Sequence, residues 1–235
     1  MCKTLDGDEP VPWNYFFGWG DPTLLPDYFT QVSNGKHKHV AELVYPFPGL
    51  VDNWYRLSKT EADYRDDPQG DIFDLQTFLE DCLARADDDP NIPWELIGGI
   101  RVVANFDYNW ATGSPLYANL GGISRIWPVT LLPKFAWSNL HVVTHEMHHA
   151  EQGFGHSITW WDKRLNFFDI MSENVNLNSC DNKHPLYGCL PMGPSSFWTS
   201  RANWTTDDRV YFVDPEPSIQ TFILESLHSG DNTGK

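Results

Sequence analysis

The chain has 235 residues, 41% of them hydrophobic, which is enough to fill the core of one large domain or two small lobes. Its 32 Asp and Glu residues outnumber its 16 Lys and Arg residues, so the formal net charge is -16 at pH 7. This charge repels phosphate backbones and anionic membranes, and we therefore expect no nucleic-acid partner. The sequence has no run of about 18 apolar residues, so we also expect no membrane span.

Residues 8–58 are rich in proline, glycine and aromatic side chains, and they predict turns held together by aromatic packing. Within them, residues 40–45 are typical of a short strand that ends before Pro46. The 11 tryptophans of the chain are irregularly spaced, which favours positions in the core over a platform for sugars.

Apolar residues follow a helical period over residues 71–86, which predicts an amphipathic helix with acidic residues favouring its first turn. Residues 96–106 come after two prolines and are rich in β-branched side chains, so they predict a buried strand. A helix followed by a strand indicates a layered α/β unit.

The next predicted elements lead to a cluster of histidines. Residues 121–129 predict a strand, and Pro128 places it at or near a sheet edge because proline has no N–H to donate. A helix then runs from Ser138, a suitable N-cap, to Gly153, which can end it in a left-handed turn. The apolar stripe of this helix consists of Leu140, Val143, Met147 and Ala150.

This helix carries two histidines and a glutamate in the order His145-Glu146-x-x-His149. Because a helix has about 3.6 residues per turn, imidazoles four residues apart point the same way and can bind one ion. Catalytic zinc takes three protein ligands and keeps its fourth position for water. Glu146 is displaced around the helix and could act as general base on that water.

The third ligand must come from elsewhere, and His156 is the natural candidate after the turn that ends the helix. His141 and His148 would need a different helix geometry to reach the same ion. The alternative without any metal is an ordinary amphipathic helix with histidines on its surface.

Together with Gly153 and His156, the pattern His145-Glu146-x-x-His149 resembles the extended zinc signature of the metzincin superfamily, H-E-x-x-H-x-x-G-x-x-H. The resemblance implies a zinc-dependent endopeptidase. Its Zn2+ ligands would be the three histidines, and its general base would be Glu146.

A second motif of the family follows downstream. Residues 168–172, Phe-Asp-Ile-Met-Ser, resemble the Met-turn, which places a methionine, here Met171, beneath the metal. The similarity covers residues 138–173. Many relatives have a tyrosine two residues beyond the methionine, but Glu173 occupies that place here.

The chain departs from the family spacing, because Gln152 stands where the signature has glycine, and Gly153 and His156 fall one position late. One extra helical residue adds about 1.5 Å of rise and about 100° of rotation, which the turn must absorb. Asp162 could replace His156, as an aspartate does in a few similar enzymes. Glu173 would be the third ligand if the chain instead resembled gluzincins.

The resemblance implies an α/β (α+β) fold with a twisted mixed sheet, an active-site helix and an irregular C-terminal lobe. Residues 1–235 would form a single catalytic domain, with an upper lobe of about residues 1–156 and a lower lobe of about residues 157–235. Residues 123–127 would be the edge strand that pairs with an extended protein or peptide substrate. The nearest branches in appearance are gametolysin-like and immune-inhibitor-A-like peptidases.

Four cysteines are compatible with two disulfides in an oxidising compartment. Cys180 and Cys189 bracket a short segment that favours a loop-closing disulfide, which leaves Cys2 and Cys82 as the other pair. Asn203 begins a glycosylation sequon, Asn-Trp-Thr, which is consistent with export. We therefore expect a secreted, extracellular protein.

Two other functions fit the same motif. A secreted zinc-containing binding or effector protein would keep the metal without turnover, although a closed four-ligand site has no use for a general base such as Glu146. A zinc hydrolase of non-peptide amides would use the same residues as a peptidase. An open coordination position would distinguish an enzyme from a binding protein.

Overall fold

The computed structural model describes residues 1–7, 24–37, 54–65, 72–106, 108, 110–137, 139–157, 169–172, 183–184, 188–189 and 193–205. Helices and strands are mixed, so the fold is of the α+β class, as the sequence predicts. The helices are α2 (Leu24–Val32), α3 (Leu75–Asp87), α4 (Leu140–Gln152) and α5 (Ser196–Arg201), and short 3-10 helices lie at Ala62–Tyr64, Trp94–Leu96 and Lys134–Ala136. The strands are β1 (Cys2–Lys3), β2 (Tyr55–Arg56), β3 (Ile100–Val103), β4 (Thr112–Leu120), β5 (Ile123–Leu132), β6 (Lys183–His184) and β7 (Gly188–Cys189).

The three-stranded sheet has the order β3-β5-β4, with β5 in the middle. β5 pairs in parallel with β3, where Ile100 faces Val129, and antiparallel with β4 along its whole length. β5 is therefore the middle strand from Val129 onward, whereas residues 123–128 pair only with β4 among the described residues and lie at an edge, as predicted for the strand at residues 121–129. Pro128 is tolerated there because pairing with β3 begins only at the next residue, Val129.

β4 and β5 form a hairpin that the sequence analysis does not predict. Gly121 and Gly122, expected at the start of a strand, form the turn instead, with φ angles of 58° and 78°. They connect Leu120 to its cross-strand partner Ile123. Two consecutive positive φ angles are typical of a two-residue hairpin turn, which glycine adopts without steric cost. The Gly-Gly pair is the signal that could have revealed this hairpin.

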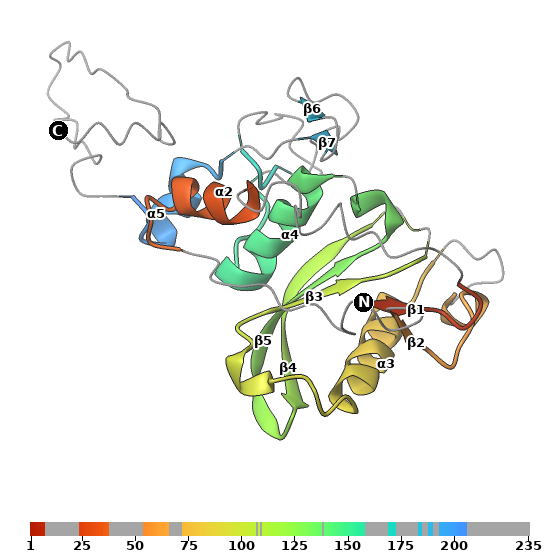
Figure 1. Ribbon diagram of the computed structural model, residues 1–235. Helices are drawn as coiled ribbons and strands as arrows, with labels where there is room; N and C mark the ends of the chain where they lie inside the picture. The colour runs from red at the N-terminus through yellow and green to blue at the C-terminus, as the bar shows by residue number, and fades with distance from the viewer. Residues whose placement is uncertain are drawn as a thin grey trace, which may run out of the picture.

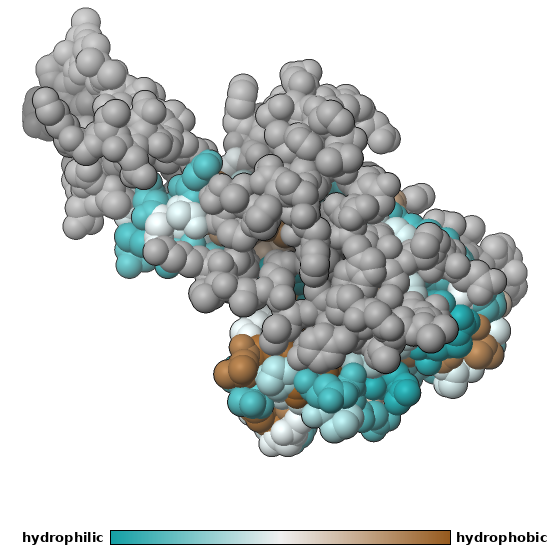
Figure 2. Space-filling model, viewed as in Figure 1, coloured by the Kyte–Doolittle hydropathy of each residue, from teal (hydrophilic) through white to brown (hydrophobic). Residues whose placement is uncertain are grey.

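The turn end of the hairpin extends beyond α4. Ile126 is six residues from Leu132, so both side chains point to the face of the sheet on which α4 packs. Leu132 is buried in the same apolar cluster as α4, whereas Ile126 is 63% exposed and its cross-strand partner Tyr117 is 72% exposed. Figure 2 shows apolar surface at this end of the molecule. α4 therefore covers only the part of the sheet near the start of β4.

The sheet lies between two apolar clusters, with α3 on one side and α4 on the other (Figure 1). The cluster beneath α3 includes Phe78 and Trp127. The cluster beneath α4 includes Val103 and Met147. Val102, the neighbour of Val103 in β3, belongs to the α3 cluster because successive strand side chains point to opposite faces.

α3 and α4 correspond to the two predicted helices. Asp74 caps α3 by accepting a hydrogen bond from the backbone N–H of Thr77 at 2.9 Å, so this helix begins later than predicted. Asn139, instead of the predicted Ser138, caps α4 in the same way. Gly153 follows α4 with a φ of 62°, which confirms the predicted left-handed turn.

Several predictions fall outside the described residues. They are the strand at residues 40–45, the Cys180 to Cys189 disulfide and most of the lower lobe. α2 lies within residues 8–58, where the proline and aromatic content did not predict a helix. No helix in the described part of the chain is long and apolar enough to cross a membrane.

A disulfide between Cys2 and Cys82 links β1 to α3, with the two Cα atoms 5.8 Å apart. This confirms the pairing that the sequence left for these two cysteines. Both belong to the apolar cluster beneath α3, where Cys2 is fully buried. The bond closes a loop between residues 80 positions apart, which restricts the unfolded chain.

Replacing Cys2 and Cys82 by alanine should lower the free energy of unfolding by about 2–5 kcal/mol, because the unfolded chain regains the freedom of this loop. Urea unfolding followed by tryptophan fluorescence measures the change. Wild-type protein treated with a reductant should unfold at the same urea concentration as the double variant. An unfolding midpoint that does not respond to reduction would contradict this role.

Candidate metal centre

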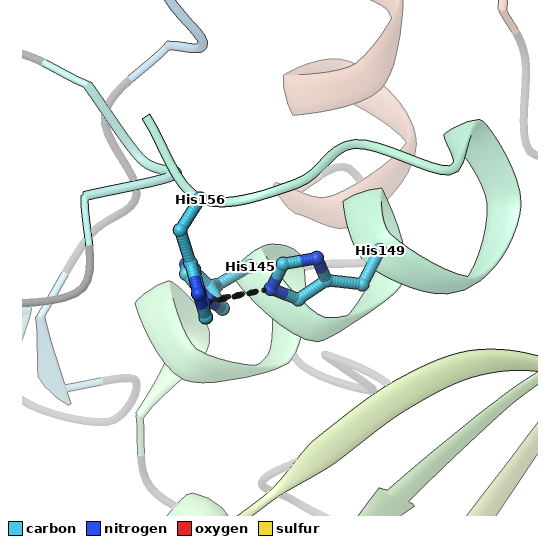
Figure 3. Close-up of side chains that lie close together, drawn as sticks. All are labelled: His145, His149 and His156. Atoms are coloured by element: carbon cyan, nitrogen blue, oxygen red, sulfur yellow. Dashed lines mark hydrogen bonds between the residues drawn. The ribbon is translucent and has the colours of Figure 1, made fainter. Parts of the chain in front are cut away.

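Three histidines, His145, His149 and His156, bring their imidazole rings together. Two come from successive turns of α4, and His156 comes from the segment that follows the helix. Figure 3 shows the three rings pointing toward one another. Their ligand atoms lie within 4.8 Å of one another, and no other group of three potential metal ligands is found among the described residues. The structure therefore brings together the three residues predicted as ligands.

The longer spacer before His156 is absorbed where α4 ends. Gly153 has a left-handed φ of 62°. Its N–H and that of the next residue still donate to the carbonyl groups of His149 and His148, at 3.2 and 3.3 Å. Phe154 is buried and its ring stacks on that of His148, with the centroids 5.3 Å apart. These contacts fix the direction in which the chain leaves the helix and returns to the histidines.

The contacts of the ring nitrogens determine which atoms face the centre. Nδ1 of His145 lies 2.5 Å from the carbonyl oxygen of Ile170, and Nδ1 of His149 lies 2.5 Å from that of Phe154. A carbonyl oxygen can only accept a hydrogen bond, so each Nδ1 carries a proton and donates it. In a neutral imidazole, Nε2 then has a lone pair and no proton.

The Nε2 atoms of the three histidines form a triangle with sides of 3.0, 3.1 and 3.2 Å. Those of His145 and His149 cannot donate to each other, because each ring carries its proton on Nδ1. Lone pairs this close repel unless a cation lies between them. Nitrogen ligands at about 2.0–2.1 Å from a tetrahedral zinc ion are about 3.3–3.4 Å apart, so the triangle fits zinc after a small expansion.

The surroundings also favour the neutral form of the histidines that metal binding requires. Burial, and then the neighbouring His149, lowers the pKa of His145 to about 3. Burial likewise lowers the pKa of His149 below its ordinary value. Both rings are therefore uncharged at neutral pH, and their lone pairs are available to a metal.

Glu146 is adjacent to His145 on α4 and faces β4. Burial raises the pKa of its carboxyl group to about 8, and a hydrogen bond from the backbone of Gly113 partly opposes this rise. A cation nearby would lower the pKa again, because opposite charge favours the carboxylate. A group whose pKa lies near neutrality suits proton transfer to and from a substrate.

Gly113 of β4 allows the strand to approach the helix at this point. A Cβ atom at Gly113 would lie 1.8 Å from the carbonyl oxygen of Glu146, which is closer than nonbonded atoms can come. No motif in the sequence singles out Gly113. The only available signal is a glycine within a strand, which often marks close approach of another backbone.

Residues 169–172 form a tight turn, as the sequence predicts. The N–H of Ser172 donates to the carbonyl oxygen of Asp169 at 3.0 Å. Met171 is fully buried in the apolar cluster beneath α4. The carbonyl group that precedes Met171 accepts the Nδ1 proton of His145, so the turn lies directly against the first histidine of the motif.

The other candidates for the third ligand do not join the triad or are not described. His141 and His148 are both buried, and Nε2 of His148 lies 3.0 Å from the hydroxyl group of Tyr28 on α2. Asp162 and Glu173 lie outside the described residues. The described residues therefore support no third ligand other than the one predicted.

Comparisons of the chain with protein-family models, with curated proteins and with solved structures find no match.

Replacing the exposed His156 by alanine should raise the zinc dissociation constant by more than about 100-fold, because a direct ligand is removed. Loss of a residue that only supports a ligand raises it by about 10–100-fold. Competition with a chromophoric chelator measures the affinity, and circular dichroism checks the fold. His37→Ala, which removes a histidine outside the triad, should bind zinc like the wild type. Equal affinity of the His156 variant and the wild type would exclude His156 as a ligand.

Gly113→Ala should lower the free energy of unfolding by about 1–3 kcal/mol, because the new methyl group forces β4 away from α4. Gly98→Ala is the matched control, since a Cβ atom there would have nothing within 4 Å. Urea unfolding of both variants measures the difference. Two variants of equal stability would show that the contact at Gly113 is not tight.

Proposed function

We propose that this protein is a zinc-dependent endopeptidase of the metzincin kind. The observation that carries the proposal is the convergence of three imidazole Nε2 atoms on one site, with the buried carboxyl group of Glu146 on the same helix. Two ligands on one helix, a third after a turn and a neighbouring carboxyl group are the parts that zinc-assisted hydrolysis needs.

His145, His149 and His156 would hold the ion and leave a fourth position open to water or substrate. When bound, zinc would polarise a peptide carbonyl group and make a water molecule easier to deprotonate. Glu146 takes the proton of that water and later delivers it to the amine that leaves the cleaved bond. The carbonyl group of Ile170 keeps the ring of His145 in the orientation that metal binding requires.

Three features of the described chain support the metzincin assignment. The sheet precedes the zinc helix in the sequence, a left-handed glycine separates the second and third ligands, and a buried methionine lies in a turn against the first ligand. In this assignment the lobes are residues 1–156 and 157–235 of a single catalytic domain.

β4 is the strand at which we expect a peptide substrate to pair. It is one of the two outer strands of the three-stranded sheet within the described residues, and Gly113 near its start contacts Glu146. An extended peptide can add to such an edge through backbone hydrogen bonds. β4 replaces residues 123–127 in this role because Gly113 places β4 against Glu146, whereas residues 123–127 pair with β4 on one side and lie toward the hairpin turn, which extends beyond α4.

A secreted location remains part of the proposal. The disulfide between Cys2 and Cys82 supports it, because such bonds persist mainly in oxidising compartments. Asn203 of the sequon is exposed at the end of α5, where a glycan would not disturb the core.

Glu146→Gln should reduce cleavage of a denatured protein mixture by about 100- to 10,000-fold, because glutamine has the size of glutamate but cannot accept the proton. The variant should still bind one zinc ion per chain. Peptide release and metal content, measured side by side with the wild type, provide the test. Glu80→Gln, which changes an exposed acid on α3, should leave cleavage unchanged.

The same assays separate the alternatives. A wild type that binds zinc but cleaves no peptide or amide would favour a binding or effector protein. Hydrolysis of small amides without cleavage of peptides would favour a non-peptide amide hydrolase. Full activity of Glu146→Gln would contradict the role of the glutamate as general base.

A further inference from the structure

Asp169 is fully buried, and its carboxylate accepts hydrogen bonds from its own turn and from two other segments. Oδ1 accepts from the backbone N–H of Met171 at 3.0 Å and from that of Ser195 at 3.1 Å. Oδ2 accepts from the hydroxyl group of Ser157, the residue after His156. A buried carboxylate is unfavourable unless donors satisfy it, so these contacts hold the three segments together.

One side of this arrangement holds the segment that carries His156. The hydroxyl group of Ser157 donates to Asp169 and accepts the indole N–H of Trp198 at 2.8 Å. The backbone N–H of Ser157 also donates to the carbonyl oxygen of Met171 at 2.9 Å. The residue next to the third histidine is therefore anchored through both its side chain and its backbone, although His156 itself is exposed.

The other side holds the ring of His145. Ile170 follows Asp169 directly, and its carbonyl oxygen accepts from Nδ1 of His145 at 2.5 Å. The N–H of Ile170 donates to the carbonyl oxygen of Gly193 at 3.2 Å, which ties the turn to the segment before α5. A shift of Asp169 would therefore move the supports of two histidines at once.

We propose that Asp169 is a positioning residue that fixes the imidazole of His156 relative to that of His145 and so sets the affinity of the site for its metal. The inference rests on the proposed metal site but not on peptidase activity. It explains how a motif with one extra residue still places its third histidine. The turn at Gly153 sets the direction of the chain, and the contact of Ser157 with Asp169 sets where it stops.

The zinc affinities of Asp169→Asn, Ser157→Ala and the double variant test this proposal. Asparagine keeps an oxygen for the N–H groups of Met171 and Ser195 but can present an NH2 group to Ser157 in place of the acceptor. Competition with a chromophoric chelator measures the dissociation constant. The absorption spectrum of the cobalt-loaded protein reports the coordination geometry. Asp74→Asn, which changes the carboxylate that caps α3, is the control.

We expect Asp169→Asn and Ser157→Ala each to raise the zinc dissociation constant by about 10–100-fold and to change the cobalt spectrum. Because both act through one contact, the double variant should lose no more affinity than Asp169→Asn alone. The Asp74 variant should match the wild type in zinc affinity and cobalt spectrum and keep close to its stability, because asparagine caps a helix about as well as aspartate.

Wild-type affinity and spectrum in Ser157→Ala and in folded Asp169→Asn would overturn the inference and leave Asp169 a purely structural residue. Should Asp169→Asn fail to fold, the result with Ser157→Ala decides. A wild type that binds zinc without cleaving peptides would refute the proposed function but not this inference. A wild type that binds no zinc would overturn both.

Discussion

The close contact between α4 and β4 at Gly113 is the constraint on which the rest of the site depends. Because glycine has no Cβ atom, the strand can lie against the carbonyl group of Glu146. The backbone of Gly113 also donates to the carboxyl group of Glu146, whereas His145 and His149 on the same helix point toward His156. Any change in the distance between helix and sheet would move these side chains together, since they share one rigid element.

Regular and irregular segments contribute differently to the site. α4 determines where the rings of His145 and His149 lie, because four residues make slightly more than one turn. The carbonyl groups of Ile170 and Phe154, which belong to irregular segments, determine which nitrogen of each ring faces the centre. A helix alone would leave either tautomer available. The turn and the segment after the helix therefore convert two suitably spaced histidines into a defined set of lone pairs.

The sequence predicts α3, α4, the α+β class and the three histidines, because helical periodicity, caps and metal-ligand spacing are local signals. The sequence does not predict β4, because Gly113 and Pro115 are poor strand residues and because the two glycines of its turn adjoin the apolar residues of β5. Pro128 indicates that the part of β5 before Val129 is unpaired on one side, but the central position of the rest of β5 depends on β3 and β4, which no local pattern reveals. Gly113 and Asp169 acquire their roles from partners far away in the sequence, and no local pattern reveals such contacts.

The disulfide and the histidine triad act on opposite faces of the same sheet. Cys2 and Cys82 lie in the cluster beneath α3, whereas the buried residues of α4 and of the turn at residues 169–172 lie in the other cluster. Reduction would therefore loosen one face, and chelation of a bound metal would loosen the other. Val102 belongs to the cluster beneath α3 and Val103 to the cluster beneath α4, and both lie in β3. Loss of order on either face would therefore affect the other face through β3. With a metal bound at the triad, redox potential and metal supply would act on one core from opposite faces.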